Sequence, residues 1–209
     1  MKKYKLTNET IVHLGFTLYR IEALMDFSDV KAGDKGGFVQ SENNLSQLCN
    51  AWAYGNAKVY DNAKVYDNAK VYDNSEVYDN AKVYDNAKVY DNSEVYGDAE
   101  VYGNAFVFGD AKVGGNAFVF GDAKVGGNAE VRGDAKVYKN SDYIVFKNWW
   151  SSGRYFTWTH SNNMWKVGCF YGKGEELIKK AYADSEESGR EYERVVRYVE
   201  SILADELNK

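Results

Sequence analysis

The segment Asn62-Ala63-Lys64-Val65-Tyr66-Asp67 is one copy of a hexad that recurs fifteen times, without insertion or deletion, from Asn50 to Lys139. The fourth position is valine in every hexad except the first, where it is Ala53, and the second position is always Ala or Ser. Side chains alternate along a strand, so these two positions point to the same side. A six-residue repeat is too short for paired helices, and it predicts a parallel β-solenoid.

Each hexad is expected to supply one short strand and one corner. The junctions between hexads read Asp-Asn, Gly-Asn or Gly-Asp, and these residues tolerate the left-handed backbone of a tight corner. The pair Ser75-Glu76 recurs at Ser93-Glu94, eighteen residues later. Three hexads per coil, and therefore five triangular coils, follow from that spacing. Ala, Ser and Val should face inward, while Lys and Tyr at the third and fifth positions should face outward.

The pattern resembles the left-handed β-helix of the hexapeptide-repeat superfamily, in which an aliphatic residue precedes a small one by four positions, as Val65 precedes Ala69. It departs from the superfamily where Tyr follows the aliphatic residue. The overall layout is similar to a group of hexapeptide-repeat proteins of bacteriophages and prophages of Gram-positive bacteria. The segments that carry this likeness are Lys3–Thr10, Asp34–Val39 with Asn44–Gln47, and Gly168–Phe170. The resemblance implies a left-handed prism and a phage origin, without a mechanism.

The segments around the repeat predict two smaller units. Residues 1–43 contain alternating stretches and are expected to form an N-terminal β cap on a solenoid that spans residues 44–140. Residues 141–209 predict an α+β module of three strands and two helices. The expected elements are strands at Tyr143–Phe146, Tyr155–Thr159 and Met164–Phe170, a helix over Glu175–Ala183, and a helix that starts at Ser188 with a capping box to Glu191.

Charge and composition argue against several classes of partner. The net charge of −5 does not favour binding to a phosphate backbone, which needs clustered Lys and Arg. Cys49 and Cys169 offer no disulfide framework, which fits a reducing compartment. The chain shows neither a signal peptide nor a run long enough to cross a bilayer. We expect a cytoplasmic protein with no membrane contact.

Catalysis is not expected from the hexads. Relatives with this coil include acyltransferases, which need a general-base His, and carbonic anhydrases, which need three His on zinc. The only histidines are His13 and His160, and both lie outside the repeat. The sequence therefore predicts no enzyme, no cofactor and no metal.

Three weaker chemical interpretations accompany that prediction. His160 and Cys169 could form a base and nucleophile pair, although a buried Cys and a surface His are preferred. The turn Gly172–Glu175 resembles a phosphate loop but lacks its Ser or Thr. Corner carboxylates such as Asp61 and Asp79 should stack, either neutralised by lysines or around a calcium ion.

Outward aromatic residues are the stronger indication of binding. Stacked Tyr columns can be purely structural, but four outward Phe in one region are not expected of a free surface, and Gly114 and Gly126 beside them would admit another surface. The candidates for an interface are Phe106, Phe108, Phe118, Phe120, Tyr72, Tyr84, Tyr90, Tyr102, Trp149, Trp150 and Trp158. With Trp165, about half of the C-terminal tryptophans are expected in the core of the module.

Three functions of different classes fit these observations. The first is a non-enzymatic interaction protein that is phage-encoded, acts in the cytoplasm of the host bacterium, forms a homo-oligomer or binds a host protein, and inhibits host defence. The second is a small-molecule or nucleotide binder, or an acyltransferase-like protein, with clefts between the solenoids of an oligomer. The third is a nucleic-acid mimic built on the Asp columns, although the interleaved lysines weigh against it.

Overall fold

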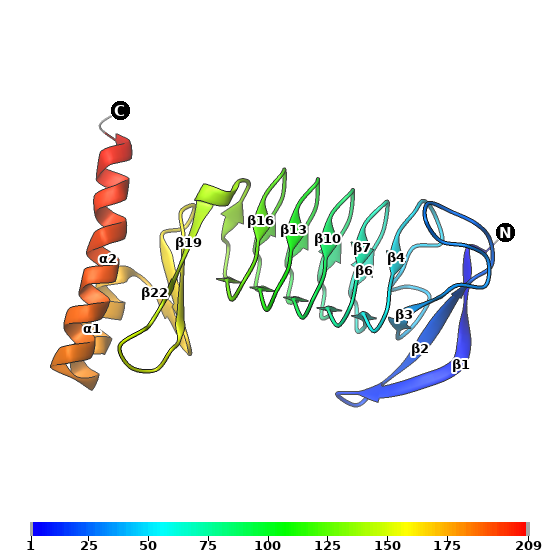
Figure 1. Cartoon of the computed structure of the whole chain (residues 1–209), viewed down its shortest axis with the longest axis horizontal. Coiled ribbons are helices and arrows are strands. Elements are labelled where there is room, and N and C mark those ends of the chain that lie inside the picture. The colour runs from blue at the N-terminus through cyan, green and yellow to red at the C-terminus, as the bar shows by residue number, and fades with distance from the viewer. Residues whose placement is uncertain (1, 208–209) are drawn as a thin grey trace.

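A computed structural model describes residues 2–207 and shows three parts along one axis (Figure 1). N-terminal strands lie at one end, a parallel β-solenoid forms the middle, and a small sheet backed by two helices closes the other end. The solenoid predicted from the hexads is confirmed.

The N-terminal strands lead directly into the solenoid. The strands β1 (Tyr4–His13) and β2 (Phe16–Ala23) form an antiparallel hairpin. The next strand, β3 (Lys35–Val39), pairs antiparallel with β2 and parallel with the solenoid strand β5 (Lys58–Val59). A Cβ atom on Gly37 would lie 2.5 Å from the carbonyl oxygen of Ala57, so the close approach of β3 requires glycine.

The solenoid therefore has about six turns rather than the five expected from the hexads. The additional first turn contains β3 on one side and Leu45, which bridges in parallel to Val65, on another. This turn lacks the hexad pattern because the cap already packs against it. Counting hexads alone could not include it.

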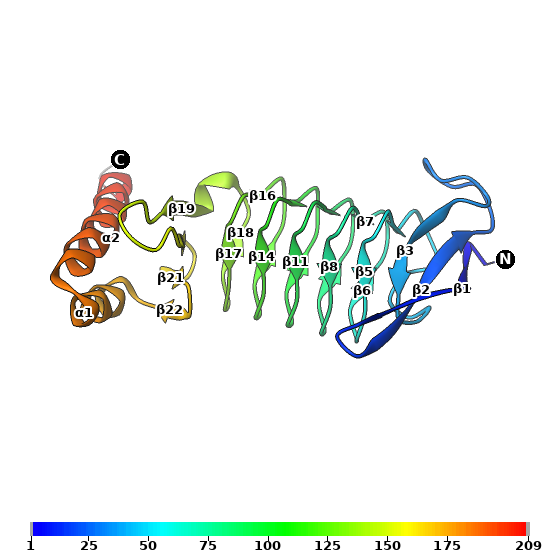
Figure 2. The same cartoon turned by 60° about the horizontal axis from the view of Figure 1, so that its bottom comes forward.

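Three parallel sheets form the sides of the solenoid, and Figure 2 shows one of these rows of stacked strands. Face one is the outer surface of β4 (Trp52–Ala53), β7 (Lys70–Val71), β10 (Lys88–Val89), β13 (Phe106–Val107) and β16 (Lys124–Val125). Face two belongs to β3, β5, β8 (Glu76–Val77), β11 (Glu94–Val95), β14 (Lys112–Val113) and β17 (Glu130–Val131). Face three belongs to β6 (Lys64–Val65), β9 (Lys82–Val83), β12 (Glu100–Val101), β15 (Phe118–Val119) and β18 (Lys136–Val137).

The interior of the solenoid is a dry column of small side chains. Every Val at the fourth position and every Ala at the second position of the hexads is buried, as predicted. The two exceptions in the column, Ser75 and Ser93, are also buried, and their hydroxyls donate to the carbonyls of Tyr72 and Tyr90 at 2.6 and 2.8 Å. The corners adopt positive φ as expected, for example 55° at Asp61.

The C-terminal module contains four strands and two helices. The predicted third strand is in fact two, because the chain turns at Gly168 with φ 53°. Ser188 lies inside the second helix and does not start it; the helix begins two residues earlier, where the Ser185 hydroxyl oxygen accepts from the Ser188 amide at 3.1 Å. The elements are η1 (Asn140–Asp142), β19 (Tyr143–Lys147), β20 (Tyr155–Thr159), β21 (Met164–Val167), β22 (Phe170–Gly172), α1 (Gly174–Asp184) and α2 (Glu186–Leu207).

The four-stranded sheet is a plug with two different faces. Phe156 and Trp158 of β20 are buried in the cluster that includes the helices. Tyr143 and Val145 of β19 pack instead against the core of the solenoid. The module thus closes the last turn, as Figure 1 shows, and the sheet separates the helices from the solenoid.

Backbone hydrogen bonds between coils run in both directions, as in any parallel sheet. The Lys64 amide donates to Ala81 at 2.9 Å and the Tyr66 amide donates to Val83 at 3.1 Å in the following coil, whereas the Val65 amide donates to Asn44 at 2.8 Å in the preceding turn. The first and the last turn therefore each present amides and carbonyls that no further coil can pair. Both ends need partners, because a buried backbone group without one is costly.

The N-terminal cap supplies donors to backbone carbonyls at the start of the solenoid. The buried ammonium of Lys3 donates to the Ala51 carbonyl at 2.8 Å, and the Tyr4 hydroxyl donates to the Leu45 carbonyl at 2.6 Å. Burial lowers the pKa of Lys3 to about 8, so the Lys3 side chain is still mostly protonated at neutral pH.

The C-terminal module supplies acceptors to amides of the last turn, and its Tyr143 hydroxyl donates to the Lys124 carbonyl at 2.9 Å. The amides of Lys124, Glu130 and Lys136, one on each side of the prism, donate to side-chain oxygens at 2.7 to 2.9 Å. The acceptors are Asn140, Thr157 and Ser161.

We expect Val83→Asp to prevent folding, because it places an unpaired carboxylate in the dry column. Lys64→Asp is the matched control, since Lys64 occupies the outward position of a neighbouring strand and is exposed. Circular dichroism and thermal melting would compare the two variants. A folded Val83→Asp protein with the native melting temperature would contradict the inward assignment.

Thr157→Val should lower the free energy of unfolding by about 1–3 kcal/mol, because the Glu130 amide loses its acceptor while the side-chain volume is kept. Thr17→Val, at an exposed position of β2, is the control. Urea denaturation measures both. Equal midpoints for the two variants would show that the module does not act as a cap on this amide.

Candidate interaction surface

Aromatic side chains at the fifth hexad position form the expected columns along the prism. On face three the rings of Tyr66, Tyr84 and Tyr102 stack at centroid distances of 4.9 Å, and Phe120 follows at 5.2 Å. The rings lean toward the next coil, where the Tyr84 hydroxyl donates to Glu100 at 2.8 Å. The columns therefore hold successive coils together by ring stacking and hydrogen bonds.

The glutamates of the hexads are neutralised within the solenoid and its caps. Glu76 accepts from Lys58 at 3.0 Å, from Tyr60 at 2.9 Å and is paired with His13 at 2.9 Å. Burial raises the pKa of the Glu76 carboxyl, but these three partners outweigh it and lower the pKa. Glu94 and Lys112 form a similar pair at 2.7 Å.

Face one differs because none of its strands carries glutamate. Phe106 lies between Lys88 and Lys124, whose ammonium nitrogens are 5.5 and 5.8 Å from the ring centroid. Within residues 2–207 neither lysine has a carboxylate within 4.0 Å. The ring of Tyr90 packs edge-on to Phe106 at 6.3 Å and stacks on Phe108 at 5.4 Å. These five residues are called the cationic strip.

The cationic strip is bounded at both ends. Toward the N-terminus, Asp29 pairs with Lys70 and accepts from the Tyr54 hydroxyl at 2.8 Å. Toward the C-terminus, the Tyr143 hydroxyl donates to the Lys124 carbonyl at 2.9 Å. The caps therefore leave open only the middle of face one, beside Tyr72.

The four predicted phenylalanines do not form one patch. All four are half-buried, with Phe106 and Phe108 on face one and Phe118 and Phe120 on face three. The expectation that Gly126 admits another surface is wrong, because a Cβ there would lie 2.2 Å from the Phe108 ring.

Gly114 is covered in the same way. A Cβ atom on Gly114 would lie 2.7 Å from the ring of Tyr96. The glycine accommodates a ring that leans from the preceding coil, and the site for a second molecule expected here is absent.

The C-terminal tryptophans divide between core and surface. Trp158 and Trp165 are each only 2% exposed, so Trp158 is not accessible to a partner as the sequence suggested. Trp150 packs against Phe156 in the same core. Trp149 is 79% exposed and is the one accessible candidate among them.

The loop that presents Trp149 is held by a buried asparagine. Asn148 is 1% exposed, and its side-chain oxygen accepts from the amides of Trp150 and Ser151 at 3.2 and 2.9 Å. The indole of Trp149 packs edge-on to Trp150 at 6.0 Å. This ordered loop makes Trp149 a second surface candidate, separate from the cationic strip.

The structure does not bring His160 and Cys169 together. His160 follows β20 and Cys169 follows β21, so the two lie at opposite ends of the four-residue strand β21, about 13 Å apart along it. Cys169 is exposed and not buried as expected. A base and nucleophile pair is not formed.

The Gly172–Glu175 turn is an ordinary start of a helix. Lys173 caps α1, and its amide donates to the Glu176 carboxylate at 3.1 Å. The Lys173 ammonium donates to the Asn162 carbonyl at 2.8 Å. The Glu176 carboxylate thus already accepts from the amide that a bound phosphate would need as a donor.

The corner aspartates accept hydrogen bonds from the backbone rather than ion pairs from lysines. Asp85 and Asp91 accept from the amides of Gly103 and Gly109 at 3.1 and 2.9 Å in the next coil. In the described part of the chain, no three His, Cys, Asp or Glu side chains are grouped to hold a metal ion. The corner columns therefore stabilise the stacking of coils.

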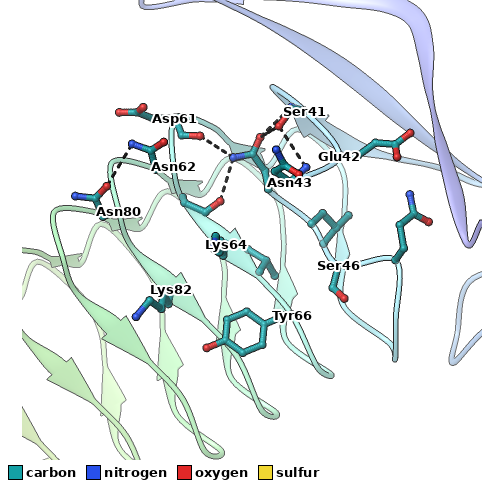
Figure 3. A pocket seen from close by; sticks show the side chains of 15 residues that line it. Ser41, Glu42, Asn43, Ser46, Asp61, Asn62, Lys64, Tyr66, Asn80 and Lys82 are labelled. Carbon is teal, nitrogen blue, oxygen red and sulfur yellow. Dashed lines mark hydrogen bonds between the residues drawn. The ribbon is translucent and has the colours of Figure 1, made fainter.

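A hollow of about 940 Å³ lies between the segment 41–47 and face three (Figure 3). The Asn44 amide donates to the carbonyls of Asp61 and Ala63 at 2.9 and 3.0 Å, and its oxygen accepts from Ser41. Lys82 is paired with Glu100 at 2.8 Å. The Asn44 side chain thus covers backbone carbonyls at the edge of face three, and the Lys82 ammonium is neutralised within the solenoid.

Comparison with protein-family models and with curated protein sequences gave no match for this chain. Among residues 2–207, no helix has both the length and the apolar character needed to cross a membrane. Function is therefore inferred from the surface itself.

The protein should lose stability above about pH 10, where unfolded tyrosine ionises. Burial, followed by the hydrogen bond to a glutamate, raises the pKa of Tyr60, Tyr78 and Tyr84. A raised folded pKa means that the unfolded state releases its protons first, so this stabilisation is complete below the unfolded pKa and falls as pH rises. Urea unfolding across that range measures the slope, and Tyr78→Phe should reduce it. A free energy of unfolding that rises with pH there would contradict the assignment.

Proposed function

We propose that this protein is a non-enzymatic interaction protein that binds a protein partner through the cationic strip of face one. The observation that carries the proposal is the lack of an internal carboxylate for Lys88 and Lys124, which flank Phe106. The hexad glutamates on the other faces are paired within the chain. A surface that combines unpaired cations with half-buried aromatic rings is suited to a partner.

The closed ends of the solenoid support an approach from the side. Lys3 and Tyr4 donate to backbone carbonyls at the N-terminal end, and the C-terminal sheet covers the other end. Covered edges do not recruit further strands. The open length of face one is then the extended surface that a partner can reach.

The resemblance to phage hexapeptide-repeat proteins suggests in which organism and with which class of partner this protein acts. We propose a left-handed solenoid, a phage-encoded accessory protein, and a host protein in the bacterial cytoplasm as the partner. Inhibition of a defence component is the specific role proposed. Self-association through the same strip is the competing outcome, and light scattering distinguishes it.

Phe106→Lys is the variant that tests the proposal, because Lys is the commonest residue at this hexad position and the fold should be retained. Phe118→Lys, at the equivalent position of face three, is the matched control. A tagged protein would capture partners from host cells, and the captured protein would then be purified and titrated by calorimetry. Saturable binding by the native chain, weakened at least about tenfold by Phe106→Lys and not by Phe118→Lys, is expected, since a ring contributes ~1.5–3 kcal/mol when it is buried. Unchanged affinity of the folded Phe106→Lys protein would refute the assignment of this surface.

A further inference from the structure

The missing charge on face one indicates the chemistry of the partner. In the Lys82–Glu100 and Glu94–Lys112 pairs, a glutamate one coil away neutralises the lysine at 2.8 and 2.7 Å. On face one the corresponding position between Lys88 and Lys124 is Phe106. Among residues 2–207, Lys64 and Lys136 of face three also lack a carboxylate partner, but only on face one does every strand lack glutamate and an aromatic ring lie between two lysines.

We infer that the cationic strip binds an acidic segment of the partner protein, with one carboxylate at Lys88, a second at Lys124 and apolar side chains beside Phe106. This inference rests on the proposed function. The strip has a hydrophobic centre with a cation on each side, and the segment would place an apolar group between two anions. The pairing therefore satisfies both charge and apolar contact.

The spacing of the coils sets the separation of the two carboxylates. Lys88 and Lys124 lie two coils apart in the same sheet, which is about 10 Å at the usual distance between strands. Residues i and i+3 of a polyproline II segment lie about 9 Å apart and on the same side. In a Glu-Leu-Pro-Glu sequence of this conformation both glutamates face the strip, and the leucine and proline between them turn about 120° to either side and flank the Phe106 ring.

The corners beside the strip favour a peptide over a nucleic acid. Lys88 is flanked by the exposed corner residues Asp85 and Asp91 of its own coil. Their carboxylates are held in place by amides of the next coil. A phosphate backbone carries continuous charge and would meet these carboxylates, whereas a segment with two separate anions fits between the corner rows.

The test uses the full chain and a fluorescein-labelled peptide that contains Glu-Leu-Pro-Glu, followed by fluorescence anisotropy at low and high salt. Saturable binding that weakens with salt is expected. Lys88→Gln/Lys124→Gln should weaken it at least about tenfold, as expected for loss of charge-assisted hydrogen bonds. Lys64→Gln/Lys136→Gln is the matched control, because it removes the two unpaired lysines of face three and gives the same net charge.

Several results would overturn the inference. They are equal binding of a Gln-Leu-Pro-Gln peptide, equal weakening by the face-three control, tighter binding of single-stranded DNA at the same strip, or occupation of the strip by a second copy in light scattering. Absence of peptide binding also counts against it. If the peptide fails while Phe106→Lys still abolishes binding of the captured protein, the proposed function stands and only the acidic segment is wrong.

Discussion

The stacking of coils through backbone hydrogen bonds is the constraint on which the rest of the molecule depends. Each coil pairs with the one before it and the one after it, so the first and last turns are left with amides and carbonyls that no further coil can pair. The Lys3 ammonium donates to a carbonyl at the N-terminal end. At the C-terminal end the Thr157 hydroxyl accepts from an amide and the Tyr143 hydroxyl donates to a carbonyl. The two caps, a hairpin and a sheet backed by helices, place these side chains where the backbone groups need them.

The eighteen-residue coil makes each outward residue a neighbour of the residues one coil before and after it. A glutamate in such a column forms an ion pair with a lysine and a hydrogen bond with a tyrosine of the preceding coil, as Glu100 does with Lys82 and Tyr84. Glutamates that interrupt the lysines of the linear repeat without an obvious order therefore stand next to a lysine once the coils are stacked. Phe106 departs from this pattern, because it stands between two lysines. Under the proposed function, this departure marks the surface that is available to a partner.

The repeat predicted the solenoid and its inward Val and Ala because period and polarity in the hexads are consistent at every position. It did not reveal the first turn, where β3 replaces the pattern with contacts to the cap. The interface candidates were predicted as outward residues, which they are on the prism, but the sequence contains no signal for the lean of the rings that covers Gly126. Trp158 and Cys169 were misjudged because their burial depends on the order of strands in a sheet with no repeat.

The position of the cationic strip follows from the caps as much as from its own residues. At the first coils of face one, Asp29 forms an ion pair with Lys70. At the last coil, the Tyr143 hydroxyl donates a hydrogen bond to the Lys124 carbonyl. An acidic residue from the chain itself is available at the N-terminal edge and is used there. One and three coils further on, no carboxylate of residues 2–207 lies within 4.0 Å of Lys88 or Lys124, although face two shows that a hexad accommodates glutamate. A single substitution at Phe106 could have neutralised Lys88, and the cation–aromatic arrangement that stands there instead is the feature on which the proposed binding depends.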